Sequence, residues 1–578
     1  MKRVFAIFCV LCLLAGLCAC GKEKSGDPAE NGGEFCAAVC AAPDSLNPFA
    51  AESELSRELF RLVYDPLWRL DENFQPENCL VDSYDLSSDG LTWTIRLRQD
   101  VTFSDGEALT SADVKFSWEL FRQYGKNAAQ RFDGIASIKC PDDWTVVITT
   151  SGTKGDMMYG EVPILPEHIW SEYASSPASM DNSAMIGSGP FVYQPVALAP
   201  GEEQDCWTLA ARADYFAGPA GLQTLCFRLY ETAANAAEAL ADGLVDACMD
   251  LTDAQLFSLG GVYGVELFAM QGPGRGWGEL MMNTASGALA DSVVREALLH
   301  AIDREEIFQM GFGSLGVYGD GFIEPRSPFY LNAATRYTFD RSQSAALLAG
   351  SLYQDYDGDG VLESRDNTME LTFRLYSTDD VWATAAATIL SRDLEEISIE
   401  LEWTTLSESE LRSRCTAEGD WDLCLIWRDG SLDPQDEAAQ YAAGASVTGW
   451  QSEQYDVLYD KLAACVDPQQ KKDICRDLQN ALIDSYPGAV LGYGSTVQAI
   501  RADRWTGYDS LTSSLGGLFT TGCIKAYMNL APVGETETSE TTETPTAPAE
   551  TESEPVLPGA SDLDEPAPLT TAVPLENG

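Results

Sequence analysis

Residues 91–121 read LTWTIRLRQDVTFSDGEALTSADVKFSWELF, and this stretch predicts a strand, a tight turn and a helix in direct succession. In its first part, apolar and polar side chains alternate, which is the period of a strand that buries one face. Residues 110–113 (TSAD) are typical of a capping box that opens a helix. The apolar stripe of that helix follows at helical spacing and consists of Val114, Trp118 and Phe121.

Similar helical stripes recur along the rest of the chain. They are formed by Val294, Leu298 and Ala301, by Leu390, Leu394 and Ile397, and by a pair of helices around Leu462 and Leu478. At 578 residues the chain is longer than one hydrophobic core usually serves. We therefore expect a mixed α/β protein of two lobes.

The composition supports a folded body and excludes one class of partner. Apolar residues make up 45% of the chain, which is enough to form large cores. The 90 Asp and Glu residues outnumber the 36 Lys and Arg residues, so the formal charge is -54. Such a chain repels phosphate backbones and anionic lipid headgroups. Nucleic acid is thus excluded as a partner, and membrane attachment is expected through a lipid or an apolar segment.

The N-terminal residues predict export and lipid anchoring. Lys2 and Arg3 precede an apolar run over residues 4–14, which is shorter than the roughly 20 residues of a membrane span. Residues 17–20 (LCAC) then resemble the bacterial lipobox, which implies cleavage before Cys20 and attachment of a diacylglycerol to its thiol. We therefore expect residues 1–20 to be a lipoprotein signal peptide and the protein to be extracytoplasmic, anchored to the bacterial cell membrane at Cys20.

Two polar segments flank the expected folded body. Residues 21–33 (GKEKSGDPAENGG) are small and turn-rich, which predicts a flexible tether. Residues 533–578 contain eleven acidic residues, no Lys or Arg and repeated Thr, Pro and Glu. This segment has too little apolar surface to offset the entropy of ordering, so we expect a disordered acidic tail.

The cysteines are expected to be mostly free and buried. Outside the expected signal peptide no C-x-x-C pair occurs, and the two histidines lie far apart, so the spacing of a zinc site is absent. The C-x-x-x-C spacing of Cys36 and Cys40 would permit a disulfide. Cys465 falls on an apolar helix face, where a buried thiol is the usual state.

A series of short motifs, in a fixed order, carries a family resemblance. They are SLNP (45–48), VYDPL (63–67), DGLTW (89–93), LRQDVTFSDG (97–106), ADVKFS (112–117), ILPEHI (164–169), GSGPF (187–191), ADYFAGP (213–219), DGLVD (242–246), MNT (282–284), VREAL (294–298), AIDR (301–304) and Trp427 with Asp433-Pro434. Across roughly residues 35–530 the sequence resembles the family 5 extracellular solute-binding proteins. These are the receptors of oligopeptide, dipeptide and nickel importers of the ATP-binding-cassette (ABC) class.

This resemblance implies a two-lobed clamp of the type II periplasmic-binding-protein architecture, with mixed sheets flanked by helices. One lobe, with an extra subdomain, is expected from residues 34–269 and 496–532, and the other from residues 270–495. A ligand that contacts both lobes only when they close drives closure through its higher affinity for the closed state. The resemblance further implies that the protein is a monomer, that it is not an enzyme and that it needs no cofactor. It also implies that the protein delivers a peptide to an ABC permease.

The resemblance also implies ligand-binding residues. In peptide-binding members, an aspartate three residues after the tryptophan binds the ligand's α-ammonium, but here that position is Gly430 and the carboxylate is on Asp429. We hypothesise that a backbone adjustment at Gly430 lets Asp429 reach the ligand; a solvated loop aspartate is the alternative. Trp427 and Tyr493 match aromatic positions beside the cleft, with core packing as the alternative.

Further charged residues are candidates for ligand contact. Glu52 lies in a segment that resembles the pocket-facing loop after the first strand of the family. An ordinary surface glutamate is the alternative. Arg275, Arg374 and Arg428 are each able to bind a ligand carboxylate with two hydrogen bonds, and their spacing does not select among them.

Residues 355–366 resemble a calcium-binding loop. Oxygen ligands at loop positions one, three, five, nine and twelve are Asp355, Asp357, Asp359, Glu363 and Asp366, with glycine at position six. Position twelve is Asp in place of the longer Glu, and no helix pair obviously flanks the loop, so an acidic surface turn is the alternative. Calcium, if bound, is expected to be structural.

Other functions remain open at this stage. The same clamp can take up nickel complexes or oligosaccharides, or sense peptides and pheromones. A secreted hydrolase is a more distant alternative, because the sequence has no Gly-x-Ser-x-Gly elbow and no histidine close to a nucleophile.

Overall fold

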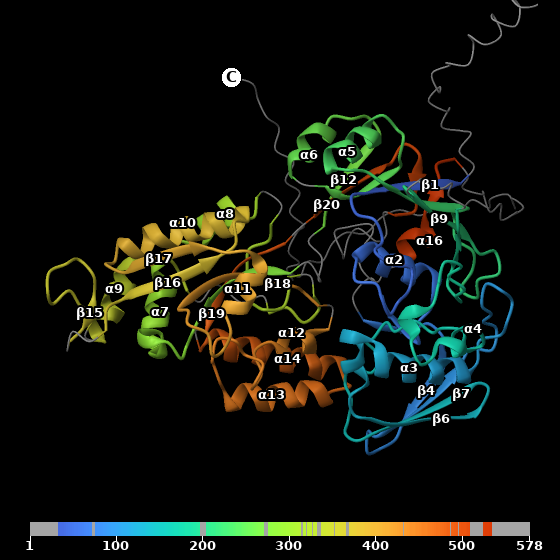
Figure 1. Cartoon of the computed structure of the whole chain (residues 1–578), viewed down its shortest axis with the longest axis horizontal. Coiled ribbons are helices and arrows are strands. Elements are labelled where there is room, and N and C mark those ends of the chain that lie inside the picture. The colour runs from blue at the N-terminus through green and yellow to red at the C-terminus, as the bar shows by residue number, and fades with distance from the viewer. Residues whose placement is uncertain are drawn as a thin grey trace, which may run out of the picture. The chain divides into compact units, whose positions relative to one another are not determined.

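The computed structural model describes residues 33–534 except 72–74, 197–203, 252, 271–275, 314–315, 320, 326, 332–336, 352, 366–368, 432, 486, 495 and 509–523 (Figure 1). The expected signal peptide with Cys20, nearly all of the tether and nearly all of the acidic tail lie outside the described residues. Within the described part, none of the helices has the length and apolar character needed to cross a membrane.

The first sheet has seven strands in the order β12, β20, β11, β1, β10, β9 and β8. In that order they span Val265–Met270, Thr496–Arg501, Ala247–Leu251, Glu34–Val39, Thr224–Leu229, Cys206–Ala211 and Phe191–Gln194. The central strand β1 pairs in parallel with β10 and β11, whereas the other neighbours pair antiparallel. The sheet is therefore mixed.

Both faces of β1 are buried, which explains why its sequence is apolar at nearly every position. Its alternate residues enter two different cores, which contain Phe35, Ala37 and Val39 on one side and Cys36 and Ala38 on the other. Helix α2 (Glu54–Val63) contributes to the first core. Helices α5 (Ala233–Ala241) and α6 (Asp253–Leu259) contribute to the second.

A separate four-stranded antiparallel sheet has the order β4, β5, β7 and β6. These strands span Val81–Leu86, Thr92–Leu97, Thr145–Thr150 and Ile135–Asp142. Strand β5 confirms the alternation seen in the sequence, and α3 (Ser111–Tyr124) confirms the helix. The capping box is formed as predicted, since the Thr110 backbone N–H donates to Asp113 Oδ2 at 2.8 Å.

The five-stranded sheet has the order β17, β16, β18, β13 and β19. These strands span Glu400–Thr405, Thr372–Ser377, Leu423–Arg428, Trp277–Met282 and Gly488–Tyr493. Every residue of β13 is buried, because the sheet is covered on both faces. The helices that flank it include α7 (Ser292–Ala301), α8 (Arg304–Gly311), α10 (Val381–Glu395), α13 (Glu453–Ala464) and α14 (Pro468–Ile483) (Figure 1). The helical stripes in these segments are thus confirmed, except that Ile397 lies just beyond the end of α10, where it is still buried.

The chain passes from the seven-stranded to the five-stranded sheet between β12 and β13 and returns between β19 and β20. Shorter elements complete the described fold. They are β2 (Trp68–Leu70), β3 (Pro76–Asn78), β14 (Tyr353–Gln354), β15 (Glu363–Ser364), β21 (Trp505–Thr506), β22 (Ala531–Pro532), α4 (Glu167–Trp170), α9 (Arg341–Gly350), α11 (Glu408–Arg414), α12 (Pro434–Ala439), α16 (Lys525–Asn529) and the 3-10 helices Lys126–Phe132, Ser171–Tyr173, Pro177–Ser179 and Gly287–Ala290.

Among the described cysteines, most are free and buried, as the sequence predicted. Cys36 and Cys40 are not joined to each other, so the permitted bridge between them is not formed. One disulfide joins Cys206 on β9 to Cys226 on β10, two strands that pair antiparallel.

Candidate functional site

Trp427 and Tyr493 lie on the two strands that flank β13, close to its first residues. Trp427 on β18 pairs with Gly278, whereas Tyr493 on β19 pairs with Trp277. Because neighbouring residues of a strand point to opposite faces, the two aromatic side chains lie on opposite sides of the sheet. The structure therefore brings both residues to one end of the sheet but does not place them on a common wall.

Trp427 belongs to a half-buried aromatic group. Its ring centroid lies 6.3 Å from that of Phe312 and 5.8 Å from that of Trp382. Glycines make room for this group, since a Cβ on Gly278 would lie 2.7 Å from both rings. A Cβ on Gly492 would lie 2.8 Å from Phe312. Trp427 thus packs against other aromatic rings at the edge of a core, which agrees with the packing alternative for this residue.

Tyr493 is a buried residue of a different core. Its hydroxyl donates a hydrogen bond to the carbonyl of Gly321, and its ring contacts that of Tyr330 edge to face at 6.4 Å. These contacts agree with the packing alternative for this residue, because its polar atom is already engaged inside the protein.

The region after β18 explains why residue 430 is glycine. A Cβ at this position would lie 2.4 Å from Glu324 Oε1 and 2.9 Å from the backbone nitrogen of Gly276. An aspartate at 430 would therefore clash with a buried carboxylate. Asp429 is exposed, and no hydrogen bond or ion pair within the described residues engages its carboxylate. It remains available to a ligand.

Sequence reasoning missed the buried acidic group beside Gly430. Glu324 is 2% exposed and accepts a hydrogen bond from the Gly276 backbone N–H. Burial, and then the neighbouring Glu324, raise the pKa of Glu437 on α12 well above its usual value. Arg131 binds Asp433 at 3.2 Å at the start of the same helix. The Asp433-Pro434 motif was the sequence signal that marked this region. It gives no indication of Glu324, which lies more than one hundred residues earlier.

The two described arginine candidates are already paired. Arg428 Nε donates to Glu279 Oε2 at 2.7 Å. Burial opposes the charge of Arg428, but the Glu279 carboxylate outweighs this effect and raises the pKa of Arg428 above its usual value. Arg374 Nε donates to Asp422 Oδ2 at 2.9 Å. Arg275 lies outside the described residues. Neither paired guanidinium is free to bind a ligand carboxylate in this arrangement.

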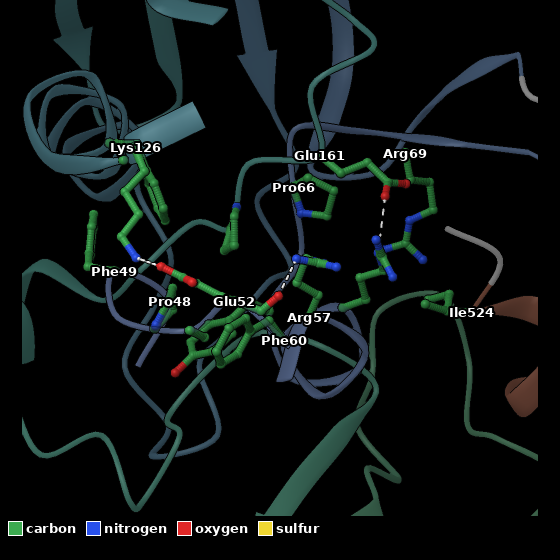
Figure 2. Close-up of a pocket in the computed structure, with 16 residues that line it drawn as sticks. Pro48, Phe49, Glu52, Arg57, Phe60, Pro66, Arg69, Lys126, Glu161 and Ile524 are labelled. Atoms are coloured by element: carbon green, nitrogen blue, oxygen red, sulfur yellow. Dashed lines mark hydrogen bonds and ion pairs between the residues drawn. The ribbon is translucent and has the colours of Figure 1, made fainter. Parts of the chain in front are cut away.

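Glu52 lines a pocket of about 580 Å³ in the lobe of the seven-stranded sheet (Figure 2). The lining consists of Pro48, Phe49, Ala51, Glu52, Arg57, Phe60, Arg61, Tyr64, Pro66, Arg69, Phe121, Gly125, Lys126, Glu161, Pro163 and Ile524. Glu52 Oε1 forms an ion pair with Lys126 Nζ. The prediction that this loop faces a pocket agrees with the lining, whereas the cationic residues of the pocket were missed. Their signal was the helical spacing of Arg57 and Arg61.

The predicted calcium loop forms a compact acidic turn between β14 and β15. Carboxylate oxygens of Asp355, Asp357, Asp359 and Glu363 all lie within 4.8 Å of one another. The first three side chains are exposed, whereas Glu363 is buried and accepts from the Asp357 backbone N–H at 3.1 Å. Asp366 lies outside the described residues.

Comparisons with known proteins agree on one family. The sequence matches the family model "Bacterial extracellular solute-binding proteins, family 5 Middle" over residues 75–449. It is 22% identical over 522 residues to the oligopeptide-binding protein AppA of Bacillus subtilis (86% of this chain, 93% of AppA). It is 24% identical over 457 residues to the glutathione-binding protein GsiB of Salmonella typhimurium (77% and 85%). The solved structure of CtaP, an ABC transporter substrate-binding protein of Listeria monocytogenes, is similar with a TM-score of 0.71 and 20% identity (87% and 99%).

Proposed function

Because the chain belongs to the bacterial extracellular solute-binding proteins of family 5, we propose that it is a lipid-anchored receptor that binds oligopeptides or dipeptides and delivers them to an ABC permease. Proteins of this family are extracytoplasmic solute-binding components of ABC importers and are not enzymes. The proposed anchor is a lipid on Cys20. The proposed mechanism is closure of two lobes around a ligand, which is later released without any chemical change.

One observation carries the proposal of a small solute as ligand. The pocket that contains Glu52 has the size of a small-molecule site and combines aromatic walls with a few charged groups. Phe49, Phe60 and Tyr64 supply flat apolar surface that accepts varied side chains. AppA is an oligopeptide-binding protein and GsiB a glutathione-binding protein, which supports a peptide-like ligand here.

The test of this function is the recovery of an intact ligand. Protein purified from its host without denaturant is expected to release peptides that mass spectrometry identifies. Adding such a peptide should change the small-angle scattering profile, because closure makes the molecule more compact. Asp429→Asn is expected to weaken peptide binding by about tenfold or more, if its carboxylate meets the ligand's α-ammonium.

Asp460→Asn is the matched control, because Asp460 is an exposed residue of α13. It should leave the affinity unchanged. Recovery of cleaved peptides, or identical scattering profiles across a broad panel of solutes, would contradict the receptor function. An unchanged peptide affinity in Asp429→Asn would rule out only the role of that residue.

We also propose that the turn at residues 355–366 binds a structural calcium ion. The gathered carboxylates of Asp355, Asp357, Asp359 and Glu363 support this, since calcium prefers oxygen ligands. Saturating calcium should raise the thermal midpoint, because binding to the folded state alone adds about 2.7 kcal/mol at one hundred times Kd. The variant with Asp357→Asn and Asp359→Asn should lose the effect. Titration calorimetry without heat, together with an unchanged melting curve, would remove the proposal.

A further inference from the structure

The pocket that contains Glu52 concentrates positive charge in a strongly acidic protein. Lys and Arg supply 36 of 578 residues in the whole chain, against 90 Asp and Glu. Four of the sixteen residues that line the pocket are cationic, whereas two are acidic. The cationic residues are Arg57, Arg61, Arg69 and Lys126. Which charge the site prefers in a ligand therefore depends on whether each of these cations already has a carboxylate partner in the protein.

Two of these cations are neutralised on the protein side of the pocket. Arg69 Nη2 lies 2.6 Å from Oδ1 of the fully buried Asp65. Arg61 Nη1 lies 3.0 Å from Glu58 Oε2, and its Nε lies 3.5 Å from Glu161 Oε2. Both guanidinium groups thus have carboxylate partners that hold them in place, and they act as part of the wall.

Lys126 is the partner of the Glu52 carboxylate. The backbone of Lys126 has a φ of 47°, a left-handed conformation that is unfavourable for a residue with a side chain. In this conformation its ammonium pairs with the Glu52 carboxylate (Figure 2). Gly125 precedes it, and a Cβ there would lie 2.4 Å from the Phe121 carbonyl. The ion pair itself lies at the surface, since the side chains of Lys126 and Glu52 are 52% and 74% exposed.

Arg57 is left with a neutral partner. Its Nη1 donates to the Glu52 backbone carbonyl at 2.7 Å, which fixes the guanidinium at the pocket (Figure 2). Within the described residues, no carboxylate pairs with Arg57, and the side chain is exposed. Its other N–H groups are donors in a fixed planar fork that matches a carboxylate. The net charge of the chain repels anions, but at physiological salt charges more than about 8 Å away are largely screened. The nearby Arg57 guanidinium therefore dominates the electrostatic potential that an anion meets in the pocket.

We propose that Arg57 is the anion-recognising residue of this pocket and that the ligand presents a carboxylate to its guanidinium. This proposal rests on the proposed function of the chain as a peptide receptor and adds the class of ligand. The carboxylate has two sources, the C-terminus of a peptide or an acidic side chain. The aromatic wall of Phe49, Phe60 and Tyr64 then packs against the apolar part of the same ligand.

The experiment presents the full chain with a random pentapeptide pool, half with free C-termini and half amidated, and identifies the retained peptides by mass spectrometry. Wild-type protein is expected to enrich one anionic class by about tenfold or more. Enrichment of free C-termini identifies the terminus as the source, and enrichment of Asp or Glu within amidated peptides identifies the side chain. Arg57→Gln should abolish the enrichment, and Arg57→Lys should keep part of it, since charge remains without the planar fork.

Arg96→Gln is the matched control, because Arg96 is an exposed arginine of β5. It forms an ion pair with Asp85 at the surface, where the two side chains are 52% and 69% exposed. It should retain the wild-type enrichment. Peptides retained without any charge preference, or a preference that persists in a folded Arg57→Gln variant, would overturn the proposal and leave the receptor function intact. Retention of no peptide at all would overturn both, so the two failures are distinguishable. Unchanged melting curves establish that the variants are folded.

Discussion

Arg428→Met is expected to lower the free energy of unfolding by about 3–5 kcal/mol, because it leaves a buried carboxylate without its cation. Glu279 is 4% exposed, and its Oε2 accepts from Arg428 Nε at 2.7 Å and from the Tyr441 hydroxyl at 3.2 Å. Only the neutral hydroxyl remains in the variant, and water cannot reach the carboxylate to replace the lost charge. Urea denaturation of the full chain at neutral pH measures the loss.

Two further variants separate this charge effect from lost packing. Adding Glu279→Gln to Arg428→Met should restore much of the stability, since both charges are then removed from the interior. Arg96→Met, in the exposed pair with Asp85, should cost no more than about 1 kcal/mol. If the double variant were as unstable as Arg428→Met alone, the loss would come from packing of the arginine stem, and the explanation by an uncompensated charge would be wrong.

Gly187→Ala is expected to destabilise the protein by about 3 kcal/mol, because the new methyl group would overlap backbone that cannot move aside. A Cβ at Gly187 would lie 2.0 Å from the Val63 carbonyl oxygen and 2.8 Å from Tyr64 Cδ1. The same carbonyl accepts a hydrogen bond from the Gly189 backbone N–H at 2.8 Å, so the two segments are tied together. The thermal midpoint of the variant, compared with that of the wild type, measures the effect.

Gly152→Ala provides the matched control in the same lobe. No atom lies within 4 Å of the Cβ that would be added there, and the backbone φ is not in the left-handed region. This variant should be neutral or stabilised by about 0.4–1 kcal/mol, because alanine restricts the unfolded chain. Equal melting temperatures for Gly187→Ala and Gly152→Ala would show that the backbone at Gly187 relaxes, contrary to the prediction.

The GSGPF and VYDPL motifs also show how far motif recognition reaches. The sequence marked both as family features, and the match over residues 75–449 confirms that family. It did not show that the two motifs contact each other. In the structure Ser188 Oγ accepts from the Asp65 backbone N–H at 3.3 Å, although the two residues are 123 positions apart. Together with the hydrogen bond from the Gly189 backbone N–H to the Val63 carbonyl, this contact joins the two motifs directly.

For the site, sequence reasoning located segments better than side chains. It placed Glu52 in a pocket-facing loop, and the pocket is there, but the arginines that surround it were not considered. It named Arg428 as one of three candidates for a ligand carboxylate, whereas Glu279 occupies that guanidinium. It gave no reason for the glycine at 430, where the nearby Glu324 carboxylate leaves no room for a side chain. The findings at Arg428 and Gly430 both come from a carboxylate more than one hundred positions away in the sequence.

Local sequence patterns were sufficient to predict one strand, several helices, the mixed α/β class and the family. The strand at residues 92–97, the capping box at Thr110 and the helical stripes depend on residues a few positions apart, whose periods are fixed by backbone geometry. Which charges are paired and which remain for a ligand could not be predicted in this way and became clear from the folded arrangement. Trp427 and Tyr493 face opposite sides because of how β18 and β19 align with β13. Among the described residues no carboxylate pairs with Arg57, while Lys126, at the start of a 3-10 helix, pairs with Glu52. Such outcomes depend on distances between residues far apart in the chain, and those distances exist only after the chain has folded.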